Sequence, residues 1–331
     1  PDLRLLLEEG LLVDLGVQGP LAYPTSSVRS VWLPETGQGY KLPLQVRITN
    51  LIRENTLEQS RRTLDAARLI HSLRGELESD AFRVVMETGY RTLDPAHPAL
   101  AVHRAAAFTV IYRPMPIEAQ HACVLASLLE PYPGEAEPKL VAAIRHGAGG
   151  EVNLERWFEA YLEVSLVPIL EILARTGVSF EAHLQNSLLR LERGWPRTLY
   201  VRDLEGVSLD REQVTGLAAW PALGIPADSP LLYSPEVAWR RTQYYFFVNH
   251  LGGVVNALAS SLGVGEARFW RLVGTRLARL REAGDSRLAA YAEELLQADH
   301  WPAKANLLSC FRQRGASPLF VDIPNPIKRA G

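Results

Sequence analysis

The sequence has 331 residues, which is enough for one large domain or two ordinary ones. Its 35 basic and 37 acidic side chains leave a formal net charge of −2, so no overall basic field would recruit nucleic acid. The most apolar stretch, residues 244–259, is interrupted by polar residues and is too short to span a bilayer. Cys123 and Cys310 are too few and too far apart for a disulfide framework or a zinc site, which favours a reducing cytoplasm.

The first part of the sequence predicts one short helix followed by a β-hairpin. Residues 2–15 have an apolar side typical of a helix. Residues 28–33 and 40–49 are predicted to be paired strands around a glycine-bearing turn. The three basic residues Arg29, Lys41 and Arg53 would then line one groove. Their spacing alone favours a solvated charged edge, which natural sheets use to resist aggregation.

A capped helix and a domain boundary are predicted next. Asn55 or Thr56 is a good N-cap for a helix that stops near Gly75. Residues 82–88 and 104–112 are predicted strands, and the apolar segment 120–129 fits either a helix or a buried strand. Residues 131–138 are dense in proline, glycine and acid, which predicts a boundary between 1–135 and 136–331.

The second part of the sequence is expected to be mostly helical. Residues 139–146 predict a short helix, and Asn153 caps an amphipathic helix that continues to Leu173. Pro168 should kink this helix, and Gly177 should end it. Helical patterns also dominate residues 234–308.

Between these helical stretches lies the most informative segment. Residues 178–185 alternate between apolar and polar, which predicts a half-buried strand. Gly194 and Pro196 predict a turn, and residues 198–201 a returning strand. This hairpin would gather six functional side chains at one end: Glu181, His183, Gln185, Asn186, Arg202 and Asp203. The alternative is a solvated face of a strand, but such a face would not be expected to concentrate six functional side chains. The oxygens of Glu181, Asn186 and Asp203 are the type that Mg²⁺ takes beside substrate phosphates.

These residues resemble a known family. Residues 181–186 with Arg202-Asp203 are similar to the signature of the NRPS-independent siderophore synthetases, the IucA/IucC family. Upstream, Ser27-Val28-Arg29-Ser30 followed by Lys41, Thr49 and Arg53 resembles the nucleotide-binding stretch of that family in order and spacing. Residues 244–250 and 304–308 resemble its C-terminal segments, so the resemblance covers nearly the entire chain.

The resemblance implies a fold and a reaction. The fold would be α+β, with antiparallel hairpins and sheets in a fingers-like nucleotide-binding part (1–135) and a palm-like part (136–331) that carries the metal and ATP hairpin and a mostly helical C-terminal region. The reaction would be adenylation of a carboxylic acid, such as citrate or a succinyl or citryl derivative, with ATP and Mg²⁺. An amine or hydroxyl of a polyamine-like or hydroxamate building block would then attack the acyl group. A homodimer is the assembly to test.

The resemblance also assigns roles by position. Nucleotide binding falls to Ser27, Arg29, Ser30, Lys41, Arg53, His183 and Gln185, and the catalytic residues would be His183, Arg53 and Arg29. Substrate binding falls to Thr49, Tyr244 and Lys304, and the metal to Glu181, Asn186 and Asp203. Cations at these positions suit the reaction, because carboxylate attack on a phosphate brings two anions together.

The sequence departs from the family pattern at three places. Ser30 stands where the family usually has threonine, which keeps the hydroxyl, and Cys310 stands where an arginine is expected. Nothing before Tyr23 resembles the histidine- and proline-rich acid-binding motif of the family's N-terminal portion. The sequence is therefore expected to correspond to roughly the last half to two-thirds of a synthetase.

Three other functions compete with this interpretation. The C-terminal part also resembles the FhuF-like ferric-siderophore reductase region, but an iron–sulfur cluster needs about four thiolates, and two cysteines cannot supply them. A kinase-like phosphotransferase would also hold Mg²⁺ with an asparagine and an aspartate across a hairpin. The sequence, however, has no H-R-D before Asn186 and no glycine-rich phosphate loop. A nucleotide- or siderophore-binding module without turnover is the non-catalytic alternative.

Overall fold

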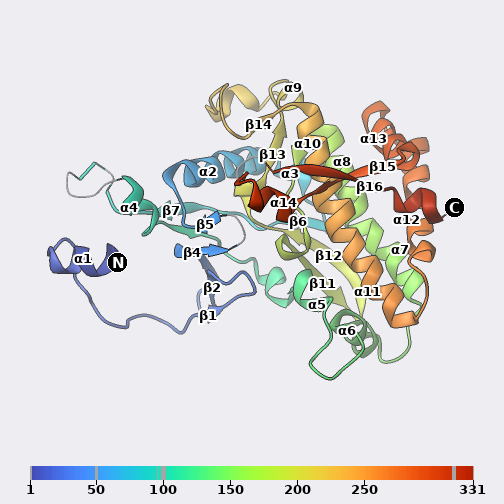
Figure 1. Ribbon diagram of the computed structural model, residues 1–331, viewed down its shortest axis with the longest axis horizontal. Coiled ribbons are helices and arrows are strands. Elements are labelled where there is room, and N and C mark those ends of the chain that lie inside the picture. Colours follow the sequence, from blue (N-terminus) through green and yellow to red (C-terminus); the bar gives the residue numbers. More distant parts are fainter. Residues whose placement is uncertain (1, 49–50, 95, 98–101, 315–317, 331) are drawn as a thin grey trace.

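The computed structural model combines small sheets with a helical C-terminal part (Figure 1). It describes residues 2–48, 51–94, 96–97, 102–314 and 318–330. Short strands of the first part lie on one side of the molecule, and the long helices α7, α11 and α12 lie on the other (Figure 1). The expected α+β class with a helical C-terminal part is confirmed.

The first part of the chain contains mostly short elements. In chain order they are α1 (Asp2–Glu8), β1 (Tyr23–Pro24), β2 (Ser30–Leu33), β3 (Gln38–Lys41), β4 (Leu44–Ile48), β5 (Leu51–Arg53), α2 (Leu57–Ser72), α3 (Arg74–Leu77), β6 (Phe82–Val84), β7 (Gly89–Arg91), α4 (Val102–Ala106), β8 (Val110–Tyr112), η1 (Ile117–His121), β9 (Cys123–Val124) and α5 (Leu125–Leu128). Strands β1, β2, β3, β8 and β7 form a five-stranded antiparallel sheet in that order. β4 and β5 form a separate hairpin.

The predicted β2–β3 hairpin and the helix α2 are confirmed. Thr56 is the N-cap of α2 and forms a capping box with Gln59, which satisfies two backbone donors at the helix start. The predicted strand 40–49 was wrong in one respect, because β3 ends at Lys41 and β4 starts a second hairpin at Leu44. Pro43 lies in the gap between them, where a residue without an N–H can break a ladder.

Three further predictions in this part were too long or of the wrong type. The first helix ends at Glu8 rather than residue 15. The strand predicted for 82–88 is reduced to β6. Residues 104–112 are not one strand, because α4 occupies the start and only β8 is extended. The ambiguous segment 120–129 contains both types, with β9 running directly into α5.

The second part of the chain is dominated by helices. Its elements are α6 (Lys139–Ala148), α7 (Leu154–Val164), α8 (Leu166–Thr176), β10 (Val178–Ser179), η2 (Leu184–Asn186), β11 (Ser187–Glu192), β12 (Trp195–Val201), η3 (Leu204–Gly206), β13 (Ser208–Asp210), α9 (Arg211–Val214), η4 (Trp220–Leu223), β14 (Leu232–Tyr233), α10 (Pro235–Thr242), η5 (Gln243–Leu251), α11 (Gly252–Leu262), α12 (Ala267–Ala283), α13 (Ser286–Gln297), β15 (His300–Lys304), α14 (Asn306–Phe311), β16 (Phe320–Pro324) and α15 (Pro326–Ala330). Within it η5 is a π-helix, which continues α10 into α11.

The predicted kink in the long amphipathic helix is a complete break. α7 and α8 are separate helices on either side of Ser165. Pro168 lies in the first turn of α8, where proline is tolerated because its missing N–H would be unpaired there in any case. Gly177 ends α8 in a left-handed conformation (φ 73°), as predicted.

The central hairpin exists, but it begins later than predicted. Only Val178 and Ser179 of the predicted strand 178–185 are extended, and they pair with β13. Residues 180–186 instead fold back on themselves, since His183 N donates to Glu181 O (2.9 Å) and Asn186 N donates to His183 O (3.0 Å). These local bonds replace a strand ladder. The hairpin itself is β11–β12, with Ser187 opposite Val201.

The β11–β12 hairpin is the centre of a four-stranded sheet in the order β6-β12-β11-β9. β6 and β9 come from before residue 135, so both predicted domains contribute strands to this sheet. The sheets were expected to be antiparallel, but two pairs are parallel. They are β6 with β12 and β13 with β14. The division at 135/136 stays a prediction.

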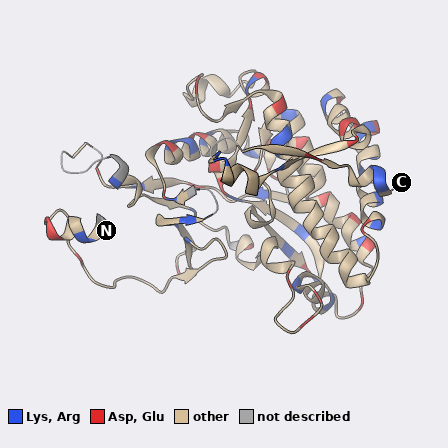
Figure 2. Ribbon diagram, viewed as in Figure 1, with Lys and Arg blue, Asp and Glu red and all other residues tan. Residues whose placement is uncertain are grey.

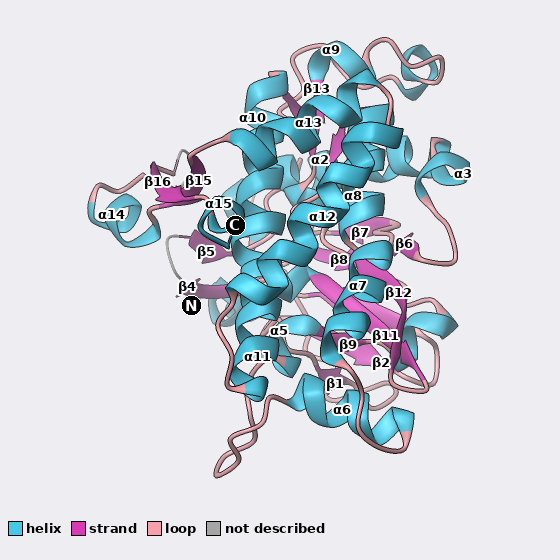
Figure 3. Ribbon diagram, turned by 90° about the vertical axis from the view of Figure 1, so that its right-hand side faces the viewer, coloured by secondary structure: helices cyan, strands magenta, loops and turns pink. Residues whose placement is uncertain are grey.

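Helices cover this sheet and enclose the main core (Figure 3). α7 packs against β12, and α12 packs in turn against α7. Trp157, Tyr161 and Phe158 of α7 are fully buried, and Trp157 Nε1 donates to Gly194 O (2.8 Å) at the tip of the hairpin. Across the described ranges, no helix has the length and apolarity to traverse a bilayer.

Candidate active site

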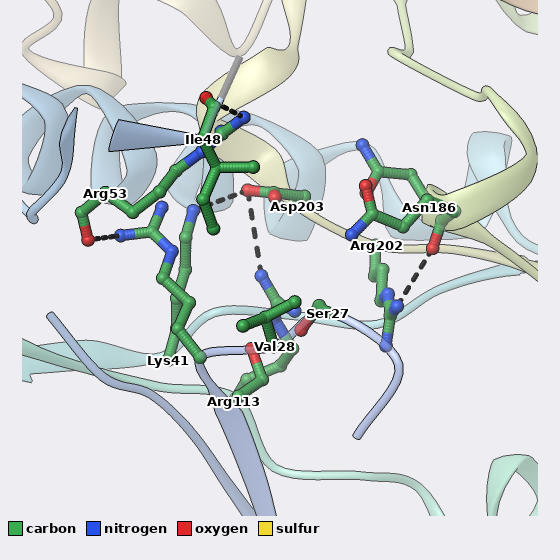
Figure 4. A pocket seen from close by; sticks show the side chains of 12 residues that line it. Ser27, Val28, Lys41, Ile48, Arg53, Arg113, Asn186, Arg202 and Asp203 are labelled. Carbon is green, nitrogen blue, oxygen red and sulfur yellow. Dashed lines mark hydrogen bonds and ion pairs between the residues drawn. The ribbon is translucent and has the colours of Figure 1, made fainter. Parts of the chain in front are cut away.

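A cavity of about 210 Å³ opens where the first sheet and the β4–β5 hairpin meet the base of the β11–β12 hairpin (Figure 4). Six separate segments contribute to its lining: the turn before β2, the end of β3, the β4–β5 hairpin, the residue after β8, η2, and the residues after β12. The lining residues are Ser27, Val28, Arg29, Ser30, Lys41, Ile48, Arg53, Arg113, Gln185, Asn186, Arg202 and Asp203.

The cavity carries an excess of positive charge. Five of its lining residues are cations and one, Asp203, is a carboxylate. The cations still outnumber the carboxylates when Glu87 and Glu205, which contact the lining residues from behind, are counted. Over the whole ribbon, by contrast, both signs of charge are interspersed (Figure 2). The local field therefore favours an anionic ligand.

Lys41 and Asp203 form the ion pair at the centre of the cavity. Lys41 Nζ lies 2.8 Å from Asp203 Oδ1 and 2.9 Å from Glu205 Oε2. Burial lowers the pKa of Lys41, but the two carboxylates outweigh this and raise it above its ordinary value. Burial likewise raises the pKa of Asp203, but Lys41 and Arg113 hold it well below its ordinary value. Both groups are therefore charged at neutral pH.

Arg113 is fixed from behind by a buried carboxylate. Glu87 is fully buried, and its Oε1 accepts from Arg113 Nη2 (2.7 Å) and Nε (3.2 Å). Its Oε2 accepts from Leu204 N (2.9 Å), next to Asp203. The same Arg113 Nη2 lies 3.6 Å from Asp203 Oδ1. Glu87 thus positions a cation and a backbone segment of the cavity at once.

Asn55 fixes two other cations. Its Oδ1 accepts from Arg29 Nη1 (2.9 Å), and its Nδ2 donates to Lys41 O (3.1 Å) and to Thr109 O (2.8 Å). Arg29 Nη1 also donates to Arg53 O (2.6 Å). These bonds use one nitrogen of the Arg29 guanidinium and the backbone of Lys41, and both residues line the cavity.

Two lining residues have a strained backbone. Val28 has φ 63° and Asp203 has φ 75°, in the left-handed region that L-residues with a side chain rarely adopt. For the β-branched Val28 this conformation is a marked outlier. Such strain persists where the surroundings over-determine the backbone, and it is concentrated at functional sites. Here it turns Ser27 and Arg29 into the cavity from one side and Asp203 from the other.

Asn186 and Asp203 are the oxygen donors of the cavity that suit a metal ion. Asn186 Nδ2 donates to Glu181 O (3.1 Å), so its amide oxygen is the atom left for a ligand. Glu181, the third predicted metal ligand, does not line this cavity. Among the described residues, no three His, Cys, Asp or Glu side chains form a group that could hold a metal ion. The donor set fits Mg²⁺, which keeps several waters and needs one or two protein oxygens beside phosphates.

A second cluster adjoins the cavity and contains Glu181. Glu181 Oε1 lies 3.8 Å from His183 Nε2, and its Oε2 lies 3.7 Å from Arg241 Nη2. Lys304 Nζ donates to Tyr245 OH and lies 4.3 Å from the Tyr245 ring centroid. Burial lowers the pKa of Lys304 to about 8, against the opposing effect of Glu181. Lys304 is still mostly protonated at neutral pH, so the cluster places two cations, Arg241 and Lys304, near Glu181.

His183 lies between the two clusters. Burial lowers its pKa, while the carboxylates of Glu181 and Asp203 oppose that shift and Lys304 reinforces it. Its ring centroid lies 5.7 Å from that of Tyr245. His183 is therefore a neutral imidazole at neutral pH, flanked by a cationic cavity and by the Glu181 cluster.

Comparison with known proteins assigns the family. Residues 1–130 match the model of the IucA/IucC family, and residues 155–318 match that of the ferric iron reductase FhuF-like transporter. L-2,3-diaminopropanoate–citrate ligase of Staphylococcus aureus (strain NCTC 8325 / PS 47) is 40% identical over 332 residues, covering 97% of this chain and 56% of that protein. The chain belongs to the IucA/IucC family.

Other members give the same result for sequence and fold. Spermidine-citrate ligase of Bacillus anthracis is 28% identical, covering 98% of this chain and 55% of that protein. The structure of ATP-bound aerobactin synthetase IucA from Klebsiella pneumoniae superposes with a TM-score of 0.84 at 25% identity, covering 99% of this chain and 59% of that one. This IucA/IucC chain therefore spans about half the length of the curated relatives it matches.

The structure distributes the predicted site residues over the two clusters. The cavity brings together Ser27, Arg29, Ser30, Lys41, Arg53, Gln185, Asn186 and Asp203. Tyr244, Lys304, Glu181 and His183 belong to the second cluster, where Lys304 Nζ lies 5.5 Å from the Tyr244 ring centroid. Thr49 lies outside the described residues.

Sequence reasoning missed several residues of this IucA/IucC site. They are Asn55, Glu87, Arg113, Glu205, Arg241 and Tyr245, and Arg202 was placed at the hairpin without a role. Glu87 could have been noticed in the sequence, because it is a lone carboxylate at the end of the apolar run 84–86. The others show no pattern, because their partners are distant in the sequence.

Proposed function

We propose that this chain provides the nucleotide site, and part of the acid site, of an ATP-dependent siderophore synthetase. The proposed reaction begins when a carboxylate oxygen of the acid attacks the α-phosphorus of ATP and pyrophosphate leaves. An amine or hydroxyl then attacks the acyl carbon, and AMP leaves. The observation that carries the proposal is the cavity in which five cations face one carboxylate and two amides.

The cavity suits the phosphate part of a nucleotide. Its volume of about 210 Å³ is below the roughly 300–1,000 Å³ typical of sites that enclose a whole drug-sized ligand. A triphosphate carries the negative charge that Arg29, Lys41 and Arg53 would neutralise. Arginine supplies forked contacts and lysine a point charge, so the two types together can hold several phosphate oxygens. The ATP-bound IucA structure with this fold supports the proposal.

Asn186 and Asp203 are the residues that would hold Mg²⁺. When bound, the ion would offset part of the negative charge of the phosphates. Asp203 Oδ1 is also paired with Lys41 Nζ, 2.8 Å away. Nucleotide binding therefore requires an exchange of partners, in which Lys41 turns to a phosphate and releases the Asp203 carboxylate. Glu205 stays as the second partner of Lys41 (2.9 Å), which limits the cost of that exchange.

The second cluster is the proposed location of the acid and of the attacking amine. Arg241 and Lys304 supply positive charge for carboxylates, and His183 lies between them and the cavity. The relatives named as citrate ligases support a polycarboxylic acid as the substrate class. Neutral His183 can accept a proton from the nucleophile as the amide or ester bond forms.

The test is product analysis with the full-length natural protein, Mg·ATP and citrate, succinate and 2-oxoglutarate derivatives. We expect AMP and pyrophosphate to form only when the right acid is present. ADP as the product would identify a phosphotransferase, and ATP binding without acid-dependent turnover would identify a binding module. The Asp203→Asn variant should bind Mg·ATP more weakly by calorimetry while its folding is unchanged. Wild-type affinity in that variant at saturating Mg²⁺ would refute the metal assignment.

A further inference from the structure

The π-helix η5 contacts the segment of residues 181–187 from one side. In a π-helix the hydrogen bonds run from residue i to i+5, so residues five apart lie on the same face. Tyr245 and His250 form one such pair in η5, and Tyr244 and Asn249 form another. π-helices are rare and are frequently found at functional sites. Because of this hydrogen-bond pattern, one face of η5 carries Tyr245 and His250, and the adjacent face carries Tyr244 and Asn249.

Asn249 and His250 bond the backbone on both sides of His183. Asn249 Oδ1 accepts from Leu184 N (3.3 Å), directly after His183. His250 Nδ1 lies 2.8 Å from Ala182 O, directly before it. Tyr245, from the same helix, lies against the His183 ring itself. One helix thus contacts the His183 ring and both neighbouring peptide groups.

The protonation of His250 follows from its partners. A carbonyl oxygen only accepts, so the proton of the neutral ring is on Nδ1 and is donated to Ala182 O. Nε2 is then an acceptor, and Tyr161 OH donates to it. His250 and Tyr161 are fully buried, and burial lowers the pKa of His250 to about 4, which keeps the ring neutral. The bridge therefore runs from the core helix α7 through His250 to the peptide before His183.

Arg202 anchors the C-terminal end of the segment, since its N donates to Asn186 O (2.9 Å) and its Nη2 to Gln185 O (2.9 Å). β10 ends at Ser179 and β11 begins at Ser187, so no strand ladder holds residues 180–186. The internal bonds of the segment fix its local turns but not its place against the rest of the protein. Ser187 Oγ adds a contact to His250 Nδ1 (3.2 Å). External anchoring on this side thus comes from Asn249 and His250.

We propose that Asn249 and His250 are positioning residues that hold His183 and Glu181 in place for the acid. The proposal rests on the proposed function in one respect, namely that the segment contacts substrate. Neither residue touches the cation-lined cavity, and the cavity residues Gln185 and Asn186 are held separately by Arg202, so nucleotide binding should not depend on Asn249 and His250. Their loss should lower turnover while the affinity for Mg·ATP stays unchanged.

Two substitutions of His250 separate positioning from packing. In His250→Asn, the side-chain amide nitrogen takes the place of Nδ1 and can still donate to Ala182 O. In His250→Gln, the amide reaches the place of Nε2 and can pair only with Tyr161. His250→Gln keeps more of the side-chain volume than His250→Asn, so a larger loss of turnover in His250→Gln cannot come from lost packing. A similar pair exists for Asn249, since Asn249→Asp keeps the acceptor for Leu184 N and Asn249→Leu removes it.

The experiment measures acid-dependent pyrophosphate release by the full-length protein and Mg·ATP affinity by calorimetry. We expect His250→Gln and Asn249→Leu to lower kcat by about 10–100-fold, because displacement of a catalytic group by about 1 Å has effects of that size. His250→Asn and Asn249→Asp should stay within about threefold of the wild type, and all four should bind Mg·ATP normally. Equal losses within each pair would overturn the proposal, and so would normal turnover in all four.

A second readout does not depend on the reaction. The imidazole of His183 can be titrated by NMR in each variant. We expect its pKa to stay below the ordinary value in the wild type and in His250→Asn, because burial is preserved. It should return toward the ordinary value in His250→Gln. Unchanged titration in His250→Gln would overturn the proposal, whereas failure of the wild type to release pyrophosphate would count only against the proposed function.

Discussion

Glu87 provides the sharpest test of how the cavity is built. It is fully buried, accepts two hydrogen bonds from Arg113 and one from Leu204 N, and touches no ligand position itself. Glu87→Ala would leave Arg113 buried without its partner, and breaking such a pair costs about 3–5 kcal/mol. Glu87→Gln keeps one neutral acceptor and the side-chain volume. It should cost about 1–3 kcal/mol, the usual range for a lost charge-assisted bond.

The functional effect of Glu87→Gln should exceed that of an ordinary destabilising change. Without the Glu87 charge, the remaining ionic partner of Arg113 is Asp203, 3.6 Å away, and a closer pair between them would compete with the metal. We therefore expect Mg·ATP affinity to fall about tenfold, equivalent to about 1.4 kcal/mol. Urea denaturation measures the stability, and calorimetry measures the affinity at a temperature where both proteins are folded.

The matched control is Glu76→Gln, which removes the charge of an exposed carboxylate in α3. It should change stability by less than about 0.5 kcal/mol and leave affinity unchanged. If Glu87→Gln binds Mg·ATP as tightly as the wild type, the placement of Arg113 does not depend on Glu87, and the reasoning from the buried pair is refuted.

Three further predictions address the cations and the buried bases. Arg29→Ala, Lys41→Ala and Arg53→Ala should each weaken Mg·ATP binding about tenfold or more, because each removes a charge-assisted contact of about 1.5–3 kcal/mol. The control Arg47→Ala, at an exposed position of β4, should leave Mg·ATP binding unchanged. Equal calorimetric effects from all four variants would indicate a general electrostatic surface. The pKa of Lys304 is about 8, so kcat/KM for the acid should stay level below that pH and fall above it, as Lys304 loses the charge that binds a carboxylate. Lys304→Arg stays charged and should abolish the fall; a persisting fall would assign it to another group. His250 has its pKa lowered to about 4 in the folded protein, so the unfolded chain binds the extra proton between pH 6.5 and 4, and folding stability is complete above that window and lost as pH falls through it. The loss reaches about 3 kcal/mol, and His250→Asn should show a shallower fall in urea titrations across the same window; identical slopes would show that His250 is protonated when folded.

The sequence determined the local features whose signals lie close together in the chain. Thr56, one of the two predicted N-caps, caps α2, and Gly177 ends α8 as a left-handed residue, because capping depends on residues within a few positions. The β11–β12 hairpin was also readable, since a turn and two apolar runs specify it. The register of that hairpin then brings Asn186 beside Arg202 and Asp203, with Arg202 N donating to Asn186 O (2.9 Å).

Only the tertiary structure decided where the polar residues of the site point. The alternation in residues 178–185 predicted a strand, but hydrogen bonds within the segment and bonds from Asn249 and His250 gave it a folded-back shape. That shape separates Glu181 from Asp203, which the sequence had placed together. Arg113 and Glu87 meet across 26 positions, and Lys41 and Asp203 across 162. No short-range pattern encodes such pairs, because their energy depends on burial and on partners that only the folded chain brings into contact.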